Sequence, residues 1–129
     1  LPAEAGATHI GMFVAWALLA GLAGELVTDD LPEAVALLRA RSVTPGALVL
    51  SAFDGKFTDE ELNPEGNSFA EFYYDSDAAQ YLDDYADALS AGTPDGPHGL
   101  YYIADTWANF DRLKPVLDRR FAEWRHPRL

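Results

Sequence analysis

The chain has 129 residues, a formal net charge of −12 at pH 7, 49% hydrophobic residues and no cysteine. Its length fits one domain spanning residues 1–129, with enough apolar material for a buried core. The lack of cysteine excludes disulfides, thiolate metal ligands and a cysteine nucleophile, and the negative charge opposes binding to nucleic acid.

An apolar stretch from Ile10 to Ala23 predicts the first helix, with Thr8 as its N-cap and its end near Gly24. The stretch is shorter than the roughly 20 residues of a membrane-spanning helix, and no basic residue precedes it as in a signal peptide. Because it is hydrophobic on nearly all sides, we expect it to lie at the centre of the fold. The protein is therefore expected to be cytoplasmic, without membrane contact.

Two prolines mark the next helix starts. Pro32 follows acidic residues and predicts a short amphipathic helix that ends near residues 39–41. Pro45, preceded by Thr44 as a cap, predicts a third helix from residue 46 to about 53. Val49 and Leu50 leave a strand as the alternative for this third segment.

Residues 54–62 resemble the second half of a calcium-binding EF-hand loop. The first two ligand positions of that loop would fall on Leu50 and Ala52, which have no side-chain oxygen, whereas calcium takes about six to eight oxygen ligands. We therefore expect no metal here. Instead we expect a turn, followed by a capping box over residues 58–61 that starts a helical turn, and this helical turn ends at residues 63–66.

The next segment, from Asn67 or Ser68 to about Ser90, is predicted to be helical with a break near residues 75–77. Apolar residues recur there at three- and four-residue spacing and predict a buried stripe, composed of Ala78, Tyr81, Leu82, Tyr85 and Leu89. A second aromatic group is also assigned to the core, namely Phe69, Phe72 and Tyr73.

Residues 91–99 have the composition of a loop, and residues 100–103 predict a short extended segment. A last helix is expected to begin at a cap on Asp105 or Thr106 and to kink or restart at Pro115. The predicted fold class is therefore mainly α, a single-domain helical bundle around the buried first helix.

The acidic residues are concentrated in the middle of the chain: between Asp54 and Asp95 there are twelve acidic side chains and one basic side chain, Lys56. This asymmetry predicts a surface for a basic protein partner, with Tyr74 or Phe57 as an aromatic anchor. The candidate partner-binding residues are Asp59, Glu60, Glu61, Glu65, Asp83, Asp84 and Asp87. The alternatives are a solvated face, or pairing within the chain with basic residues of the last helix: Arg112, Lys114, Arg119, Arg120 and Arg125.

No catalytic motif is present. His9, His98 and His126 lack the spacing of metal ligands on one helix, and there is no phosphate-binding loop or nucleophile elbow. We therefore expect no catalytic residue, metal or cofactor. One alternative is a small enzyme or ligand-binding protein whose site combines His9, His98 and carboxylates. Another is an oligomeric adaptor that associates through the first helix; otherwise a monomer or weak homodimer is expected.

Three parts of the chain carry a resemblance to a known family: residues 6–13 (Gly-Ala-Thr-His-Ile-Gly-Met-Phe), residues 54–67 with Asp-Gly-Lys and Asn-Pro-Glu-Gly-Asn, and residues 111–124, which begin Asp-Arg-Leu-Lys-Pro. Together they resemble a small bacterial domain family of unknown function, which in turn looks similar to immunity proteins of polymorphic toxin systems. The resemblance implies a non-enzymatic domain that binds and blocks a cognate basic toxin domain. It also implies residues before Leu1.

Overall fold

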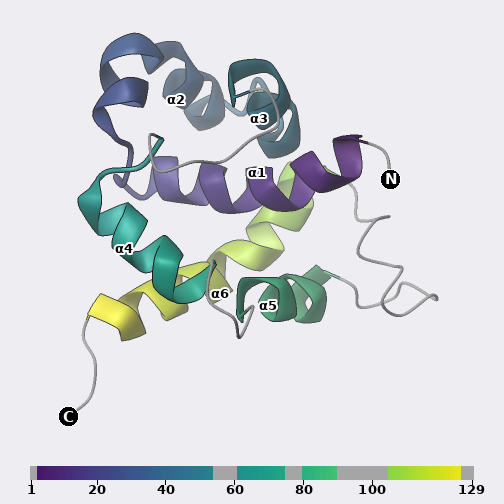
Figure 1. Ribbon diagram of the computed structural model, residues 1–129. Coiled ribbons are helices and arrows are strands. Elements are labelled where there is room, and N and C mark those ends of the chain that lie inside the picture. The colour runs from purple at the N-terminus through teal and green to yellow at the C-terminus, as the bar shows by residue number, and fades with distance from the viewer. Residues whose placement is uncertain (1–2, 54–60, 75–79, 90–104, 126–129) are drawn as a thin grey trace.

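The computed structural model describes residues 3–53, 61–74, 80–89 and 105–125 (Figure 1). Within these ranges the structure contains helices and one isolated antiparallel bridge, Ala23 to Leu62, but no strand. The prediction of a mainly α fold is confirmed. The helices are α1 (Ala3–Leu19), a π-helix η1 (Leu26–Asp30), α2 (Pro32–Arg39), α3 (Pro45–Phe53), α4 (Pro64–Tyr73), α5 (Gln80–Leu89) and α6 (Trp107–Arg125).

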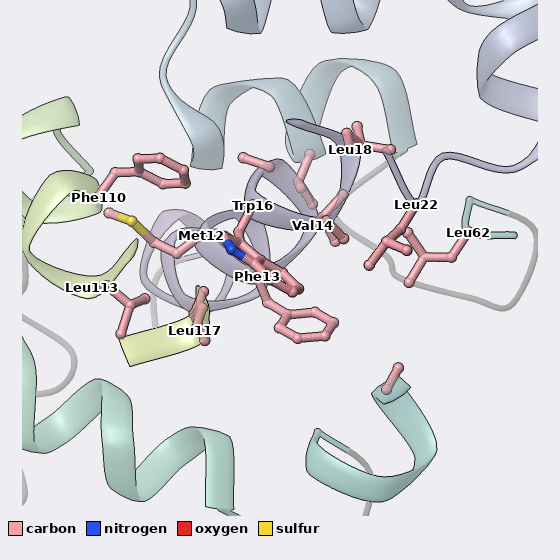
Figure 2. Close-up of a cluster of buried hydrophobic side chains, with 14 of the residues drawn as sticks. Met12, Phe13, Val14, Trp16, Leu18, Leu22, Leu62, Phe110, Leu113 and Leu117 are labelled. Atoms are coloured by element: carbon pink, nitrogen blue, oxygen red, sulfur yellow. The ribbon is translucent and has the colours of Figure 1, made fainter. Parts of the chain in front are cut away.

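The first helix, α1, lies at the centre of the fold, as predicted. It runs between α2 and α3 on one side and α4, α5 and α6 on the other (Figure 1). All side chains from Met12 to Leu18 are at most 2% exposed. Buried residues of α6, namely Phe110, Leu113 and Leu117, lie along one side of α1 (Figure 2). This buried stretch offers no free face for the adaptor alternative. None of the described helices combines the length and apolarity that crossing a bilayer would need.

The ends of α1 differ from those expected. The helix begins at Ala3, before Thr8, and ends at Leu19 instead of near Gly24. Gly21 has φ +87°, the Leu22 N–H donates to the Ala17 carbonyl at 3.0 Å, and the Gly21 N–H donates to the Leu18 carbonyl at 3.4 Å. These two bonds form a Schellman motif, which requires the left-handed conformation that glycine adopts without strain.

Helix starts follow the prolines. α2 and α3 begin at Pro32 and Pro45, as predicted, and α3 is helical, which excludes the strand alternative. α4 begins at Pro64, earlier than predicted, because the Asn63 side chain accepts a hydrogen bond from the Gly66 N–H at 2.8 Å. The residues expected to end a helical turn therefore begin a helix.

α6 continues through Pro115, so the predicted restart does not occur. Proline leaves the Asp111 carbonyl without an N–H donor, and both Pro115 and Asp111 are exposed, so this part of the helix lies on its solvent side. Leu113 and Leu117 on either side of it are fully buried and hold the helix against the core. Packing therefore outweighs the hydrogen bond that proline removes.

The tyrosine stripe of α5 is buried at Tyr81, Tyr85 and Leu89, as predicted. In α4, Phe69 and Tyr73 are buried and stack at 5.2 Å between ring centroids, but Phe72 is 50% exposed, so its assignment to the core is wrong. The EF-hand-like residues 54–60, the predicted break at 75–77 and the predicted extended segment at 100–103 lie outside the described residues.

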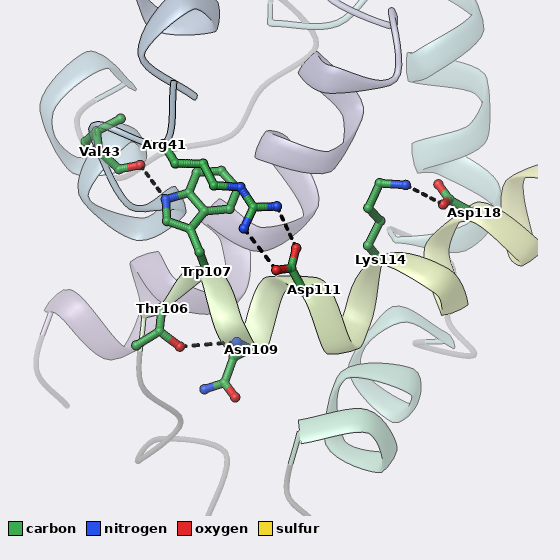
Figure 3. Close-up of polar contacts among 8 residues, drawn as sticks. All are labelled: Arg41, Val43, Thr106, Trp107, Asn109, Asp111, Lys114 and Asp118. Carbon is green, nitrogen blue, oxygen red and sulfur yellow. Dashed lines mark hydrogen bonds and ion pairs between the residues drawn. The ribbon is translucent and has the colours of Figure 1, made fainter. Parts of the chain in front are cut away.

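The N-terminus of α3 is capped by a carboxylate from a distant part of the chain. Asp105 accepts hydrogen bonds from the Thr44 hydroxyl at 2.6 Å, the Gly46 N–H at 2.8 Å and the Ala47 N–H at 3.1 Å. A Cβ atom on Gly46 would lie 2.7 Å from the Asp105 Oδ2, so glycine leaves room for the cap. Thr106 caps α6 instead, because its Oγ1 accepts the Asn109 N–H at 3.2 Å (Figure 3).

We expect Asp105→Ala to lower the free energy of unfolding by about 2 kcal/mol, because it removes three hydrogen bonds to a charged acceptor at a helix N-terminus. Asp111→Ala, in α6 shortly after Asp105, is the matched control. It removes an exposed ion pair with Arg41 (2.7 Å), which solvent screens, and should cost clearly less stability than Asp105→Ala. Urea denaturation of both variants measures the difference, and equal losses would contradict the capping role.

Candidate functional site

A groove of about 440 Å³ is lined by residues of α4, α5 and α6. It is lined by Phe72 of α4, Gln80 of α5, and Arg120, Glu123 and Trp124 of α6. The groove thus combines two aromatic side chains with an amide, a guanidinium and a carboxylate. Such a mixture is typical of a binding site in which apolar walls carry a few polar groups.

A buried polar network adjoins this groove through Arg120 and joins the three helices. Asp84 of α5, only 8% exposed, accepts a hydrogen bond from the Tyr73 hydroxyl at 2.6 Å. The same carboxylate accepts two hydrogen bonds from Arg120, from Nε at 2.9 Å and from Nη2 at 3.1 Å. This two-point geometry orients Arg120 in the groove wall.

The protonation states in this network are well defined. Burial by itself would raise the pKa of Asp84, but the hydrogen bonds from Arg120 and Tyr73 outweigh it and hold that pKa below its ordinary value. Burial, reinforced by the Asp84 carboxylate, raises the pKa of Tyr73 far above its ordinary value. Asp84 is therefore ionised and Tyr73 neutral at physiological pH, and the charges of Asp84 and Arg120 cancel.

The aromatic wall rests on the core. Trp124 is partly buried and packs on Phe121 and Phe69, with ring centroids 5.9 Å and 5.5 Å away. Phe72 extends from the neighbouring helix into solvent. Aromatic side chains that pack on the core on one side and contact solvent on the other are suitable anchors for a partner surface.

Two of the seven acidic residues predicted for an exposed surface are buried. Glu61 is 4% exposed, because the chain here pairs with the segment after α1: the Gly24 N–H donates to the Glu61 carbonyl at 2.9 Å. Asp84 is buried in the network described above. The expectation of surface exposure is therefore corrected for both residues.

The other predicted residues are placed as follows. Glu65 is exposed and pairs with Arg125 at 3.2 Å, and Asp83 and Asp87 are exposed, whereas Asp59 and Glu60 lie outside the described residues. The alternative of pairing with the last helix thus applies to Glu65 and Asp84. Within the described ranges, neither Asp83 nor Asp87 has an ion-pair partner.

The helical spacing of α5 relates these free carboxylates to the groove. Gln80, Asp83, Asp84 and Asp87 follow the i, i+3, i+4, i+7 pattern of one helix face. Asp83 and Asp87 therefore extend this face beyond the groove wall at Gln80. The groove has acidic neighbours on α5 and its own carboxylate, Glu123, on α6.

The aromatic anchors differ from those proposed from the sequence. Tyr74 packs against Phe13 and Tyr81 at 4.9 Å and 5.3 Å between ring centroids, and Phe57 lies outside the described residues. Phe72, which was predicted from the sequence to lie in the core, and Trp124 line the groove. The spacing of buried positions along α4 (residues 66, 69, 70 and 73) excludes Phe72 from the stripe and would have identified it.

The histidine-based alternative depends on side chains outside the described part of the chain, those of His9 and His98. Among the side chains that the structure does describe, no group of three His, Asp or Glu residues is arranged to hold a metal ion.

Comparison with known proteins gives one match. A family model described as a domain of unknown function (DUF7832) matches residues 1–98. That range includes α1 to α5, hence the Phe72 and Gln80 walls of the groove, while α6 follows it. No curated protein and no solved structure matches the chain.

Proposed function

Because the chain belongs to the DUF7832 family, a domain of unknown function, we propose a function from its own surface: it is an acidic protein-binding domain for a basic protein partner. Its biological role in this proposal is that of an immunity protein, which binds and blocks a cognate bacterial toxin domain. The groove of α4, α5 and α6 is the centre of the interface.

The observation that carries this proposal is the half-exposed Phe72 beside Trp124, in a groove with carboxylates around it. Protein interfaces combine aromatic anchors at a desolvated centre with a polar rim. Asp83 and Asp87 supply rim charges without a partner among the described residues, and a net charge of −12 attracts a basic protein over a distance. Such steering increases association rates by about 10 to 10³-fold.

The network beside the groove supports binding more than catalysis. A general acid or base works best with a pKa near the operating pH. The pKa of Asp84 is lowered and that of Tyr73 is raised, so each moves away from neutrality. Both groups also have their hydrogen bonds satisfied within the chain, which suits a rigid support for Arg120.

The test is charge reversal on the proposed face. We expect the double variant Asp83→Lys/Asp87→Lys to lose capture of a basic partner from the native host, and to lose protection when that partner's toxic domain is co-expressed. Both residues are exposed, so the variant should melt within a few degrees of the wild type. Mass spectrometry of material captured at low and moderate salt identifies the partner, and salt should weaken the capture.

The control is Asp29→Lys/Glu33→Lys, which changes the net charge equally at exposed positions of η1 and α2. It should retain both capture and protection. If the two double variants lose capture equally, attraction is a property of total charge and the proposed face is wrong. If neither variant loses protection, the acidic-surface proposal fails.

A further inference from the structure

We propose that the groove of Phe72, Gln80, Arg120, Glu123 and Trp124 holds an arginine or lysine side chain of the partner. This inference rests on the proposed function and specifies the chemistry of its central contact. The groove is 440 Å³ in volume, which is ample for one such side chain.

The charge balance of the groove favours a cation. Both bonds from Arg120 to Asp84 are short, so the positive charge of Arg120 is already neutralised. The Nη1 atom of Arg120 lies 3.8 Å from the Glu123 Oε1, which is too long for a hydrogen bond, and Glu123 is largely exposed. Glu123 therefore has only one long ion pair, to Arg120, which is itself bonded to Asp84, so the Glu123 carboxylate can accept a second cation.

The walls of the groove suit both the stem and the head group of an arginine or lysine side chain. Arginine and lysine have an apolar stem that packs on hydrophobic surface, and a charged head that is attracted to aromatic faces. Phe72 and Trp124 provide the apolar and aromatic surface, and Glu123 provides the counter-charge. Gln80 adds an amide oxygen that can accept a further hydrogen bond from the head group.

The same combination already occurs within this chain. The Cζ atom of Arg41 lies 4.6 Å from the centroid of the Trp107 ring, while its Nη1 and Nη2 donate to Asp111 at 2.9 Å and 2.7 Å (Figure 3). A tryptophan and a carboxylate on one helix, four residues apart, thus hold a guanidinium. Trp124 and Glu123 are adjacent in α6 and not four residues apart, but both line the groove, and within the described residues no guanidinium lies over the Trp124 ring.

An anionic ligand is disfavoured by the same contacts. The guanidinium of Arg120 is already paired with the buried Asp84, and an anion that drew it away would leave that carboxylate without its cation. Glu123 in the groove, and Asp83 and Asp87 along the same face of α5, would also repel it.

The test uses the indole N–H resonances of the full-length chain in ¹⁵N NMR, titrated with N-acetyl-arginine amide. We expect the Trp124 resonance to shift saturably. N-acetyl-citrulline amide has nearly the same shape without the charge and should bind at least about threefold more weakly. Trp16 and Trp107 serve as internal references, because their indole N–H groups donate to Asp118 at 2.8 Å and to the Val43 carbonyl at 3.1 Å.

Variants assign the contact. Glu123→Gln and Phe72→Ala should each weaken binding of the arginine derivative, while Glu33→Gln on α2 should not. All three positions are exposed, and unchanged Trp16 and Trp107 resonances confirm that each variant is folded. The inference is overturned if citrulline amide binds as tightly as arginine amide, if N-acetyl-glutamate amide binds more tightly, or if Trp124 does not respond.

This outcome is separable from the proposed function. If the groove fails this test while Asp83→Lys/Asp87→Lys still loses the partner, the partner docks on the acidic face without a cation in the groove. If the groove binds arginine amide while the charge reversal leaves capture intact, the cation site stands and the acidic face is not the interface.

Discussion

Replacing Gly11 with alanine is expected to lower the free energy of unfolding by about 2–4 kcal/mol, a large part of the stability of a domain of this size. α1 and α3 touch backbone to backbone at this position. A Cβ atom on Gly11 would lie 2.5 Å from the Pro45 carbonyl oxygen and 2.7 Å from the Gly46 nitrogen. The helices would have to separate, because neither neighbour is the end of a flexible side chain.

The sign of this effect is diagnostic. Within an isolated helix, alanine is more favourable than glycine by about 1 kcal/mol, so helix propensity alone predicts stabilisation. Gly66→Ala is the graded control: its nearest contacts would be at 3.1 Å, to the Cβ atoms of Leu22 and Leu62. We expect a smaller loss there, measured by urea denaturation of both variants. A Gly11→Ala protein as stable as the wild type would contradict the close approach of the two helices.

The second large effect is expected from Asp84→Ala, which should cost about 2–4 kcal/mol by removing the acceptor for both Tyr73 and Arg120. The Tyr73 hydroxyl is buried and would lose its 2.6 Å partner. Arg120 is partly exposed and can turn toward Glu123 or water, so the loss stays below that for a fully buried pair. Asp84→Asn keeps part of the hydrogen bonding and should cost about 1–2 kcal/mol.

The contribution of the Asp84 charge depends on pH. Because the folded-state pKa of Asp84 is lowered, its ionisation stabilises the protein above the unfolded-state value of about 4 and is lost as pH falls through the folded value. The stability gap between the wild type and Asp84→Asn should therefore be constant from pH 7 to about 5 and shrink below about pH 4.

Asp83→Asn, at the exposed neighbouring position, is the control for this pH series. It should change stability by less than about 0.5 kcal/mol at any pH. Denaturation curves at several pH values provide the comparison. A gap for Asp84→Asn that stays constant down to pH 3 would show that the charge of Asp84 does not contribute.

Several features were predictable because they depend on local rules. The uninterrupted apolar run of α1 could only be buried, and Pro32 and Pro45 favour helix starts wherever they occur. The three- and four-residue spacing of Tyr81, Tyr85 and Leu89 placed one face of α5 in the core. The pairing of acidic residues with the last helix was foreseen as an alternative from charge segregation.

The roles of individual acidic residues could not be predicted. Asp83 and Asp84 are adjacent in the sequence and chemically identical, yet one faces solvent and the other is buried against Tyr73 and Arg120. That difference depends on a helix 36 residues away in the chain. The prediction from charge density alone therefore placed Asp84 and Glu61 on the exposed surface, although both are buried.

The sequence by itself determined the helical class, the central position of α1 and the excess negative charge. These properties depend only on composition and on the spacing of residues within each segment. Only the tertiary structure decided that Asp105 caps a distant helix, that Gly11 allows two backbones to touch, and that Phe72 and Trp124 meet in one groove. Each of these depends on how helices far apart in the chain pack together, and no local pattern of residues encodes that packing.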